Sequence, residues 1–193
     1  TLVTNTLKTS DVIFEGAQGV LLDEAYGLGP NTTWSDCTPR NARYILNYLE
    51  VPHKILTWGC LKPFTTRHGA GPFPSHDPSM IPSHYDPYNV TNDYQGDFRV
   101  GSFDLDLHMY AANVIGGVDA LAIHGLDLDK SFKISSRGIS ETRSISKLMN
   151  IKPTKSITVA NTKFCELISK KFDAPVRIKG YSPDIHGKIY TPE

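Results

Sequence analysis

Hydrophobic and polar positions alternate along the chain in two ways, which together predict a protein that mixes strands with helices. Short continuous apolar runs are typical of buried strands, and they predict strands over residues 12–14, 54–58, 61–66, 118–123 and 176–179. Apolar residues at intervals of three or four predict helices over residues 38–50, 103–115 and 161–172. Thr38 and Pro39 resemble a helix start, and Gly116 and Gly117 a helix end.

Polar stretches separate these elements. Residues 1–10 are rich in threonine and predict a loop or the tail of a helix, and the glycine, proline and asparagine residues within 24–33 predict a loop. Repeated prolines in residues 69–88 break both helix and strand, so they predict a long loop of the kind that is usually functional. Residues 130–156 are basic and weakly patterned, and they predict strand and loop.

Composition narrows the class of protein. The 193 residues carry 20 basic and 20 acidic side chains, so the formal net charge of zero gives no sign of nucleic-acid or membrane binding. No apolar run is long enough for a membrane helix, and the first residues do not resemble a signal peptide. Three separated cysteines without a CxxC pair indicate a reducing compartment, and we expect a cytoplasmic protein.

Histidines and aspartates of the proline-rich loop form a pattern that could bind a metal, namely His76-Asp77 followed by His84 and Asp86. Solvated loop histidines are the more common cause of such a pattern. The sequence therefore predicts no metal site in this chain.

A glycine turn follows the predicted strand over residues 12–14. Gly16 and Gly19 permit positive φ and a close approach of a ligand to the backbone. Ligands of open α/β sheets bind beyond the carboxyl ends of strands, where this turn falls, and the Gln18 amide suits the edge of a purine or a ribose. An ordinary turn with a surface glutamine is the simpler interpretation of these residues alone.

Several motifs together resemble the adenylosuccinate synthetases, which join aspartate to a 6-oxopurine nucleotide at the expense of a nucleoside triphosphate. FEGAQGVLLD at residues 14–23 matches the family's FEGAQGxLLD, and residues 33–38 resemble its TSSNTT segment. TRHGAGPFP at residues 66–74 resembles TRVGAGPFP, residues 98–104 resemble RRVGWFD, and residues 182–184 resemble the terminal GPD. The resemblance runs from about residue 10 to residue 184.

The resemblance implies an α/β fold with three layers, a mostly parallel sheet with flanking helices as in P-loop NTPase-like synthetases. The resemblance begins about halfway along the sequences of the family. We therefore expect residues 1–193 to be a single domain, the carboxyl-terminal portion of a larger enzyme. The phosphate loop, the catalytic residues and the Mg²⁺ ligands of the family lie in the other half. No catalytic residue is expected in this chain, which alone should not catalyse, and the complete enzyme should be a homodimer.

The resemblance also assigns candidate residues for the acceptor nucleotide, either IMP or dGMP. The glutamine and threonine of the matching motifs contact this nucleotide, which implies roles for Gly16, Gln18 and Thr33. His68 stands at the family's valine position beside the sugar, so it is a candidate contact, and an exposed loop imidazole is the alternative.

The segment that binds L-aspartate in the family, GATTGRRRR or similar, is replaced here by residues 89–99. Only Arg99 survives of its arginines, which are the natural bidentate clamp for a carboxylate. The candidates for aspartate binding are therefore Thr91 and Arg99 with nearby backbone amides. A purely structural Arg99 is the alternative.

Candidates for the triphosphate site are Gly125, Asp127, Ser182 and Pro183. Asp127 matches the aspartate of the family's TKLD motif, which accepts two hydrogen bonds from guanine, whereas Gly125 replaces the lysine of that motif. This departure predicts that ATP can serve as well as GTP. An ordinary cap after a strand is the alternative for Asp127.

The leading hypothesis is a carbon–nitrogen ligase of purine nucleotide biosynthesis that uses GTP or ATP through a 6-phosphoryl intermediate. Two branches of the family compete, a parent branch that takes IMP and a phage branch of the diaminopurine pathway that takes dGMP. Residues 36–39 and the altered TKLD motif resemble the phage branch. A non-catalytic nucleotide-binding module, or a degenerate homologue, is the alternative of another class.

Overall fold

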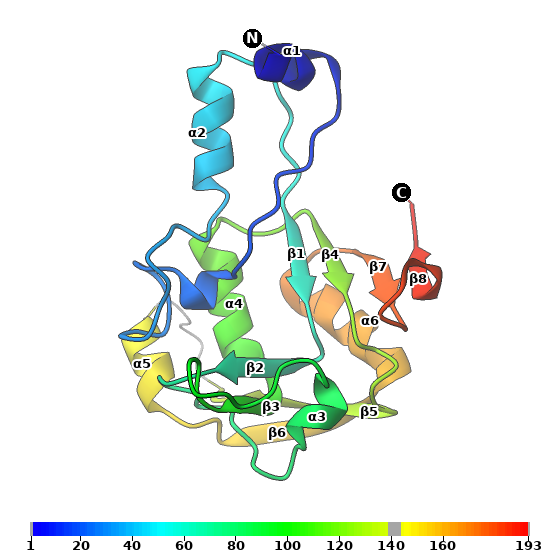
Figure 1. The fold of residues 1–193 in the computed structure, drawn as a ribbon. Helices are drawn as coiled ribbons and strands as arrows, with labels where there is room; N and C mark the ends of the chain where they lie inside the picture. Colours follow the sequence, from blue (N-terminus) through cyan, green and yellow to red (C-terminus); the bar gives the residue numbers. More distant parts are fainter. Residues whose placement is uncertain (1, 139–143, 193) are drawn as a thin grey trace.

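The computed structural model describes residues 2–138 and 144–192, and it shows an α/β protein in which helices flank two four-stranded sheets (Figure 1). The predicted α/β class is therefore confirmed. The chain passes from the first sheet to the second between β1 (Trp58–Leu61) and β2 (Phe64–His68), across Lys62 and Pro63, and Pro63 lacks the N–H that a continuing strand would need.

The first sheet has the order β1-β4-β7-β8, with β1, β4 and β7 parallel and β8 antiparallel to β7. β4 is buried at every position because its residues, Ala-Leu-Ala-Ile, are apolar on both faces, as is typical of a central parallel strand. The predicted strands over residues 118–123 and 176–179 are confirmed. The strands of this sheet are β1 (Trp58–Leu61), β4 (Ala120–Ile123), β7 (Val176–Gly180) and β8 (Lys188–Tyr190).

The second sheet is mixed and has the order β2-β3-β5-β6. β2 runs antiparallel to β3, β3 parallel to β5, and β5 antiparallel to β6. Its strands are β2 (Phe64–His68), β3 (Phe98–Asp104), β5 (Ser131–Ser136) and β6 (Lys155–Ala160). The strand predicted within residues 130–156 is confirmed as β5 and the start of β6, but residues 145–150 form the helix α5 where strand and loop were predicted, because a six-residue helix is too short to show an apolar period. Residues 139–143 lie outside the described part of the chain.

The helices predicted from apolar spacing are confirmed as α2, α4 and α6. Asp104 caps α4 by accepting a hydrogen bond from the Leu107 amide at 3.2 Å, and Gly116 and Gly117 end it with φ of 84° and 97°. The helices are α1 (Leu2–Thr9), α2 (Arg40–Tyr48), α3 (Pro82–Tyr85), α4 (Leu105–Val114), α5 (Ile145–Asn150) and α6 (Asn161–Phe172), with short 3-10 turns η1 (Val20–Leu22) and η2 (Ile185–Gly187).

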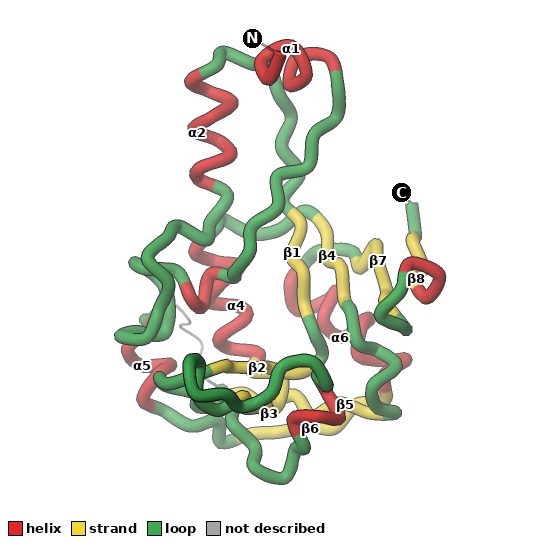
Figure 2. The backbone as a smooth tube through the Cα atoms, in the orientation of Figure 1, coloured by secondary structure: helices red, strands yellow, loops and turns green. Residues whose placement is uncertain are grey.

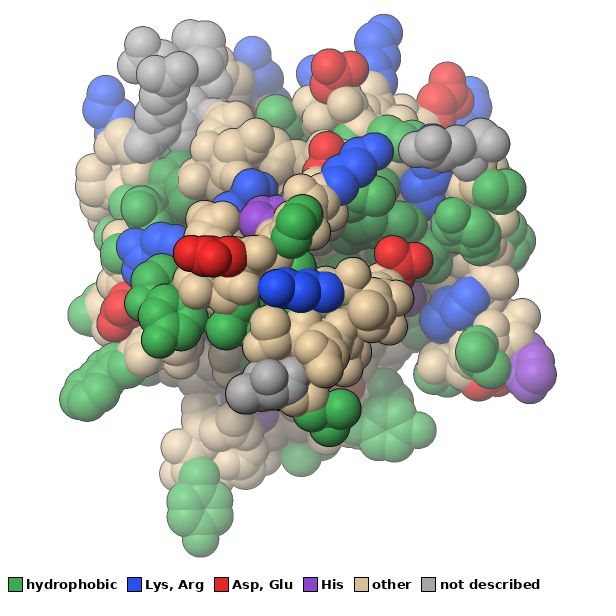
Figure 3. Space-filling model, turned by 90° about the horizontal axis from the view of Figure 1, so that it is seen from above, with side chains coloured by type: hydrophobic (Ala, Val, Ile, Leu, Met, Phe, Trp, Pro, Cys, Tyr) green, Lys and Arg blue, Asp and Glu red, His purple; other side chains and the backbone are tan. Residues whose placement is uncertain are grey.

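The main core lies where α6 packs on the two sheets, while the buried Leu107 and Tyr110 of α4 form a second cluster with Leu28 and Leu148. Phe103 and Phe164 meet edge to face in the main core with ring centroids 5.3 Å apart, and Leu121, Ile123 and Ile168 are fully buried around them. By contrast, α1 and α2 stand away from the sheets (Figures 1 and 2), and Figure 3 shows apolar side chains among the charged ones at that end. No helix of the described residues is both long and apolar enough to span a bilayer.

Three strand predictions in the first 70 residues are corrected. Residues 12–14 form no strand, and Ile13 is 92% exposed, because no described strand offers these residues hydrogen-bonding partners. The strand predicted over residues 54–58 begins only at Trp58, since parallel pairing with β4 sets Trp58 opposite Ala120. Similarly, the strand predicted over residues 61–66 begins at Phe64 and ends at His68.

Candidate functional site

The loop that carries the first motif is built around the buried carboxylate of Asp23, which is 1% exposed. One oxygen accepts hydrogen bonds from the amides of Ala25 and Tyr26 at 2.8 and 3.0 Å, and the other accepts from the Cys37 amide at 2.7 Å. Asp23 thereby fastens η1 and its following turn to residues 33–38. An aspartate directly before a glycine-containing loop is typical of an Asx turn, so Asp23 is a site-forming residue with a local sequence signal.

Candidate acceptor residues lie on both sides of η1. The Thr33 amide donates to the Leu22 carbonyl at 2.8 Å, and the Thr33 hydroxyl lies 3.2 Å from that of Ser35. Gly16 and Gln18 are exposed just before η1, so the Gln18 amide is free to meet a ligand. The structure therefore holds Thr33 firmly against η1 and presents Gln18 at its start.

Arg67, a buried residue of β2, joins this loop to the TRHG turn. Its guanidinium donates to the Ala70 carbonyl at 3.0 Å, to Asn31 at 2.6 Å and to Leu28 at 3.5 Å. Burial lowers the pKa of Arg67, and the neighbouring charge of Arg99 lowers it further. Three carbonyl partners compensate for this burial, so Arg67 fixes the distance between the two loops.

Arg99 stands directly opposite Arg67 in the antiparallel pairing of β2 with β3. One terminal nitrogen of Arg99 donates to the carbonyls of Gly69 and Gly71 at 2.6 and 3.1 Å, and its guanidinium carbon lies 5.6 Å from the Phe73 ring centre. Gly71 must be glycine, because its φ is 108° and a Cβ would lie 2.2 Å from an Arg67 nitrogen. Arg99 thus shapes the turn, and its predicted contact with aspartate remains a prediction.

His68 connects the same turn to the segment 89–99. Its ring meets Phe98 edge-on with centroids 5.5 Å apart, and its Nε2 lies 3.4 Å from the Asn92 amide nitrogen. The Thr91 hydroxyl accepts from the Phe98 amide at 3.4 Å. One face of the molecule therefore brings together the predicted sugar contact, His68, and the predicted aspartate residues, Thr91 and Arg99.

The predicted triphosphate residues form a second group at the carboxyl ends of β4 and β7. The Leu126 amide donates to the Gly180 carbonyl at 3.0 Å, which ties the turn after β4 to the end of β7. Gly125 adopts φ of 76°, and a Cβ there would meet Leu128 Cδ1 at 3.2 Å. The Asp127 carboxylate is exposed beside this turn. Asp127 is therefore accessible to a base, while the backbone at Gly125 disfavours a lysine.

Ser182 and Pro183 lie in the turn that follows β7. The Ser182 hydroxyl donates to Asp184 Oδ1 at 2.9 Å, and this bond, first among several, lowers the pKa of the Asp184 carboxyl. The Lys188 ammonium donates to the Ser182 carbonyl. Burial, and then the Lys188 charge, lower the pKa of His124 in the facing turn, which favours a neutral imidazole.

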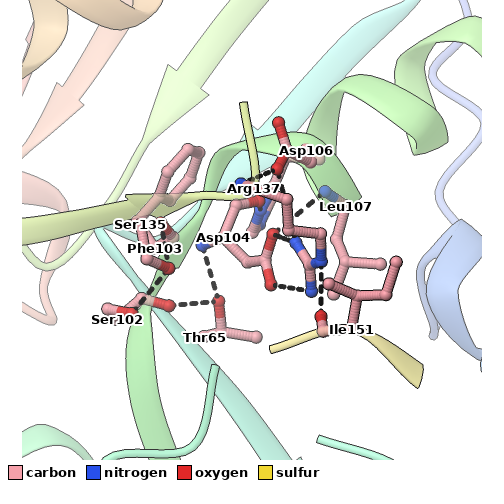
Figure 4. Close-up of polar contacts among 10 residues, drawn as sticks. Thr65, Ser102, Phe103, Asp104, Asp106, Leu107, Ser135, Arg137 and Ile151 are labelled. Carbon is pink, nitrogen blue, oxygen red and sulfur yellow. Dashed lines mark hydrogen bonds and ion pairs between the residues drawn. The ribbon is translucent and has the colours of Figure 1, made fainter. Parts of the chain in front are cut away.

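Behind the first group, a fully buried ion pair joins β3 to the end of β5 (Figure 4). Arg137 donates to both carboxylate oxygens of Asp104 at 2.6 and 2.9 Å and to the Ile151 carbonyl at 2.7 Å. Its backbone amide donates to Asp106. Asp104 ends a matched motif, but nothing local in the sequence marks Arg137 as its partner, because the two meet only when β3 and β5 pair.

The acidic groups of the proline-rich loop have partners of their own. Asp77 accepts from the Ser79 hydroxyl at 2.6 Å and pairs with Lys133 at 3.0 Å, while Asp86 accepts from the Asn89 side chain at 2.8 Å. Within residues 2–138 and 144–192, no three His, Cys, Asp or Glu side chains are grouped to hold a metal ion.

Comparisons with known proteins agree with these motifs. The profile of the adenylosuccinate synthetase family matches residues 1–135. The adenylosuccinate synthetase of Deinococcus radiodurans is 39% identical over 128 residues, which cover 61% of this chain and 30% of the relative. That of Desulforamulus reducens is also 39% identical, over 133 residues that cover 66% of this chain and 30% of the relative. The chain thus matches about a third of the length of these relatives.

Two solved structures share the fold. A fully ligated adenylosuccinate synthetase from Plasmodium falciparum superposes with a TM-score of 0.77 at 19% identity, covering 99% of this chain and 53% of that one. The succinoaminodeoxyadenylate synthetase PurZ of cyanophage S-2L, bound to dGMP and dATP as an energy donor, gives 0.53 at 16% identity, covering 92% and 45%. With its motifs, its fold and the family profile in agreement, the chain belongs to the adenylosuccinate synthetase family.

Proposed function

We propose that this chain is part of a ligase that condenses L-aspartate with a 6-oxopurine nucleotide, IMP or dGMP, with GTP or ATP as the energy source. The observation that carries the proposal is the pair Arg67 and Arg99. Arg67 ties the loop beside Thr33 to the TRHG turn, and Arg99 holds that turn next to Thr91. The residues matched to acceptor and to aspartate binding thereby lie in one connected region of loops.

In this proposal each side chain binds or orients a reactant. The Gln18 amide hydrogen-bonds the purine edge, and the Thr33 hydroxyl donates to the nucleotide phosphate. Thr91, Arg99 and backbone amides hold the carboxylates of aspartate. The triphosphate phosphorylates the purine O6, which turns a poor leaving group into phosphate, and the aspartate amine then displaces that phosphate at C6.

The proposed enzyme is a cytoplasmic homodimer. Its catalytic groups lie in the half of the family's sequence that this chain does not match. The resemblance to the family assigns the Mg²⁺ ligands to that other half, and no step is derived from the metal here. The second candidate function is a non-catalytic nucleotide-binding module. The replacement of all but one of the family's arginines in residues 89–99 favours this candidate.

We expect Gln18→Ala, made in the protein that carries this chain, to lower kcat/KM for the acceptor nucleotide about two- to tenfold, as one lost hydrogen bond of about 0.5–1.5 kcal/mol requires. The melting temperature should not change, because Gln18 is exposed. Asn41→Ala, which removes an exposed amide from α2, is the matched control. Unchanged kinetics in the Gln18 variant would remove this residue from the site. Weaker nucleotide binding in a protein without turnover would favour the module.

We further expect ATP and GTP to support turnover with kcat/KM values within about tenfold of each other. Asp127 retains part of guanine recognition, whereas Gly125 provides neither the charge nor the packing of a lysine, and a site that has lost half its contacts discriminates weakly. Asp127→Ala should lower kcat/KM for GTP more than for ATP, which serves as the internal control. A preference for GTP of about a hundredfold or more would contradict this prediction and favour the parent branch.

A further inference from the structure

The turn after β4 places an imidazole among the residues matched to triphosphate binding. Parallel pairing sets Ile123 opposite Lys179, so the next residues, His124 and Gly180, are neighbours at the carboxyl ends of β4 and β7. The His124 side chain is partly exposed, and its ring nitrogens have no hydrogen-bond partner among the residues that the structure describes. The ring is therefore accessible to a ligand from solvent.

The position of this ring is fixed by its surroundings. The His124 amide donates to the Leu61 carbonyl at 2.9 Å, and the Leu126 amide donates to the Gly180 carbonyl at 3.0 Å, which holds the turn against β1 and β7. On Gly180, a Cβ would lie 2.8 Å from Nδ1 of His124 and 3.3 Å from Cδ of Lys188. Only glycine at this position lets the imidazole and the lysine stem lie so close to the strand.

Lys188 links this ring to the turn that carries Ser182 and Pro183. Its ammonium donates to the Ser182 carbonyl. Burial, and then the charge of Lys188, lower the pKa of His124 and favour a neutral imidazole. A neutral imidazole offers a planar face to a base and adds no cation that would favour one base over another. The two turns matched to triphosphate binding therefore meet at His124 and Lys188.

The neighbouring Gly125 does not supply the packing surface that a base requires. Its φ is 76°, and a Cβ on it would meet Leu128 Cδ1 at 3.2 Å and Phe64 Cε1 at 3.5 Å. A side chain at this position would therefore start against Leu128 and Phe64. His124, by contrast, is an accessible planar group in the same turn as the exposed Asp127.

We propose that the imidazole of His124 stacks on the base of the nucleoside triphosphate and provides the packing that Gly125 lacks. Asp127 then contacts the edge of the base, and Lys188 holds the turn that carries Ser182. Stacking on a ring tolerates different bases, because every base has a π face. The site therefore accepts a purine triphosphate with either adenine or guanine. This inference rests on the proposed function, which assigns the triphosphate to these turns.

Calorimetric titration of the protein that carries this chain with the β,γ-imido analogues of ATP and GTP measures affinity without turnover. His124→Ala should raise the Kd for each analogue at least about fivefold, and the two factors should agree within about threefold, because stacking does not read the edge of a base. His124→Phe keeps an aromatic face without ring nitrogens, so its Kd should stay within about threefold of wild type. His84→Ala, which removes an exposed imidazole from α3, is the matched control and should bind like wild type.

The outcomes separate this inference from the proposed function. Unchanged affinity of His124→Ala for analogues that the wild type binds would overturn stacking and leave the ligase proposal standing. A loss confined to one analogue, or a His124→Phe variant as weak as His124→Ala, would also overturn it, because the ring nitrogens would then read the base. Binding of neither analogue to the wild type would overturn both proposals. Circular dichroism melting of each variant distinguishes lost affinity from lost folding, and the melting temperatures should match the wild type because His124 is partly exposed.

Discussion

Arg137→Met lowers the free energy of unfolding by about 3–5 kcal/mol, the loss expected when one partner of a buried ion pair is removed. Arg137 and Asp104 are both 0% exposed at the side chain, and their closest atoms are 2.6 Å apart. The substitution leaves the Asp104 carboxylate without its cation in the space between β3, α4 and β5. Urea unfolding followed by circular dichroism measures the loss.

Arg40→Met provides a control of the same chemistry at the same distance. Arg40 pairs with Asp36 at 2.6 Å, but its side chain is 70% exposed, so solvent screens the pair and the expected loss is at most about 1 kcal/mol. The double variant Asp104→Asn with Arg137→Met should recover part of the stability, because the Asp104 charge is then removed together with its partner; Asp106, 3.5 Å from Arg137, still loses its cation, so recovery is incomplete. Equal losses for the two single arginine variants would show that burial does not set the strength of the pair.

Arg67→Met raises the Kd for the acceptor nucleotide at least about tenfold, the second large effect that we expect. The variant removes a guanidinium that donates to three carbonyls on two loops, and hydrogen bonds to a charged group are worth about 1.5–3 kcal/mol each. The loop that carries Thr33 then loses its fixed distance from His68. Calorimetric titration with IMP and dGMP measures the affinity, and urea unfolding measures a loss of about 3 kcal/mol in stability.

The control for this prediction separates positioning from general destabilisation. Arg43→Met removes an exposed guanidinium from α2 and should change neither quantity. Arg67→Lys keeps the charge, but a single ammonium cannot serve three carbonyls in the same geometry, so affinity should recover only in part. An Arg67→Met variant that is less stable yet binds nucleotide with wild-type affinity would contradict a positioning role for Arg67.

The sequence by itself determined the helices and the buried strand whose pattern of apolar residues is local. Helices α2, α4 and α6 follow from apolar spacing, since a helix buries one face whatever covers it, and Gly116 and Gly117 end α4 because positive φ suits glycine. The buried strand β4 follows from its apolar run. The family motifs likewise identified the loops of the candidate site, because a motif is matched by residue type and order in the sequence and needs no distances between atoms.

The tertiary structure alone decided which segments meet. Residues 12–14 carry a strand-like sequence and remain unpaired, because a strand exists only where a second backbone supplies its hydrogen bonds. The contact of Arg67 with Asn31 and that of Asp104 with Arg137 join residues more than 30 positions apart. Such contacts depend on strand pairing across the whole chain, and no local pattern of residue types records them.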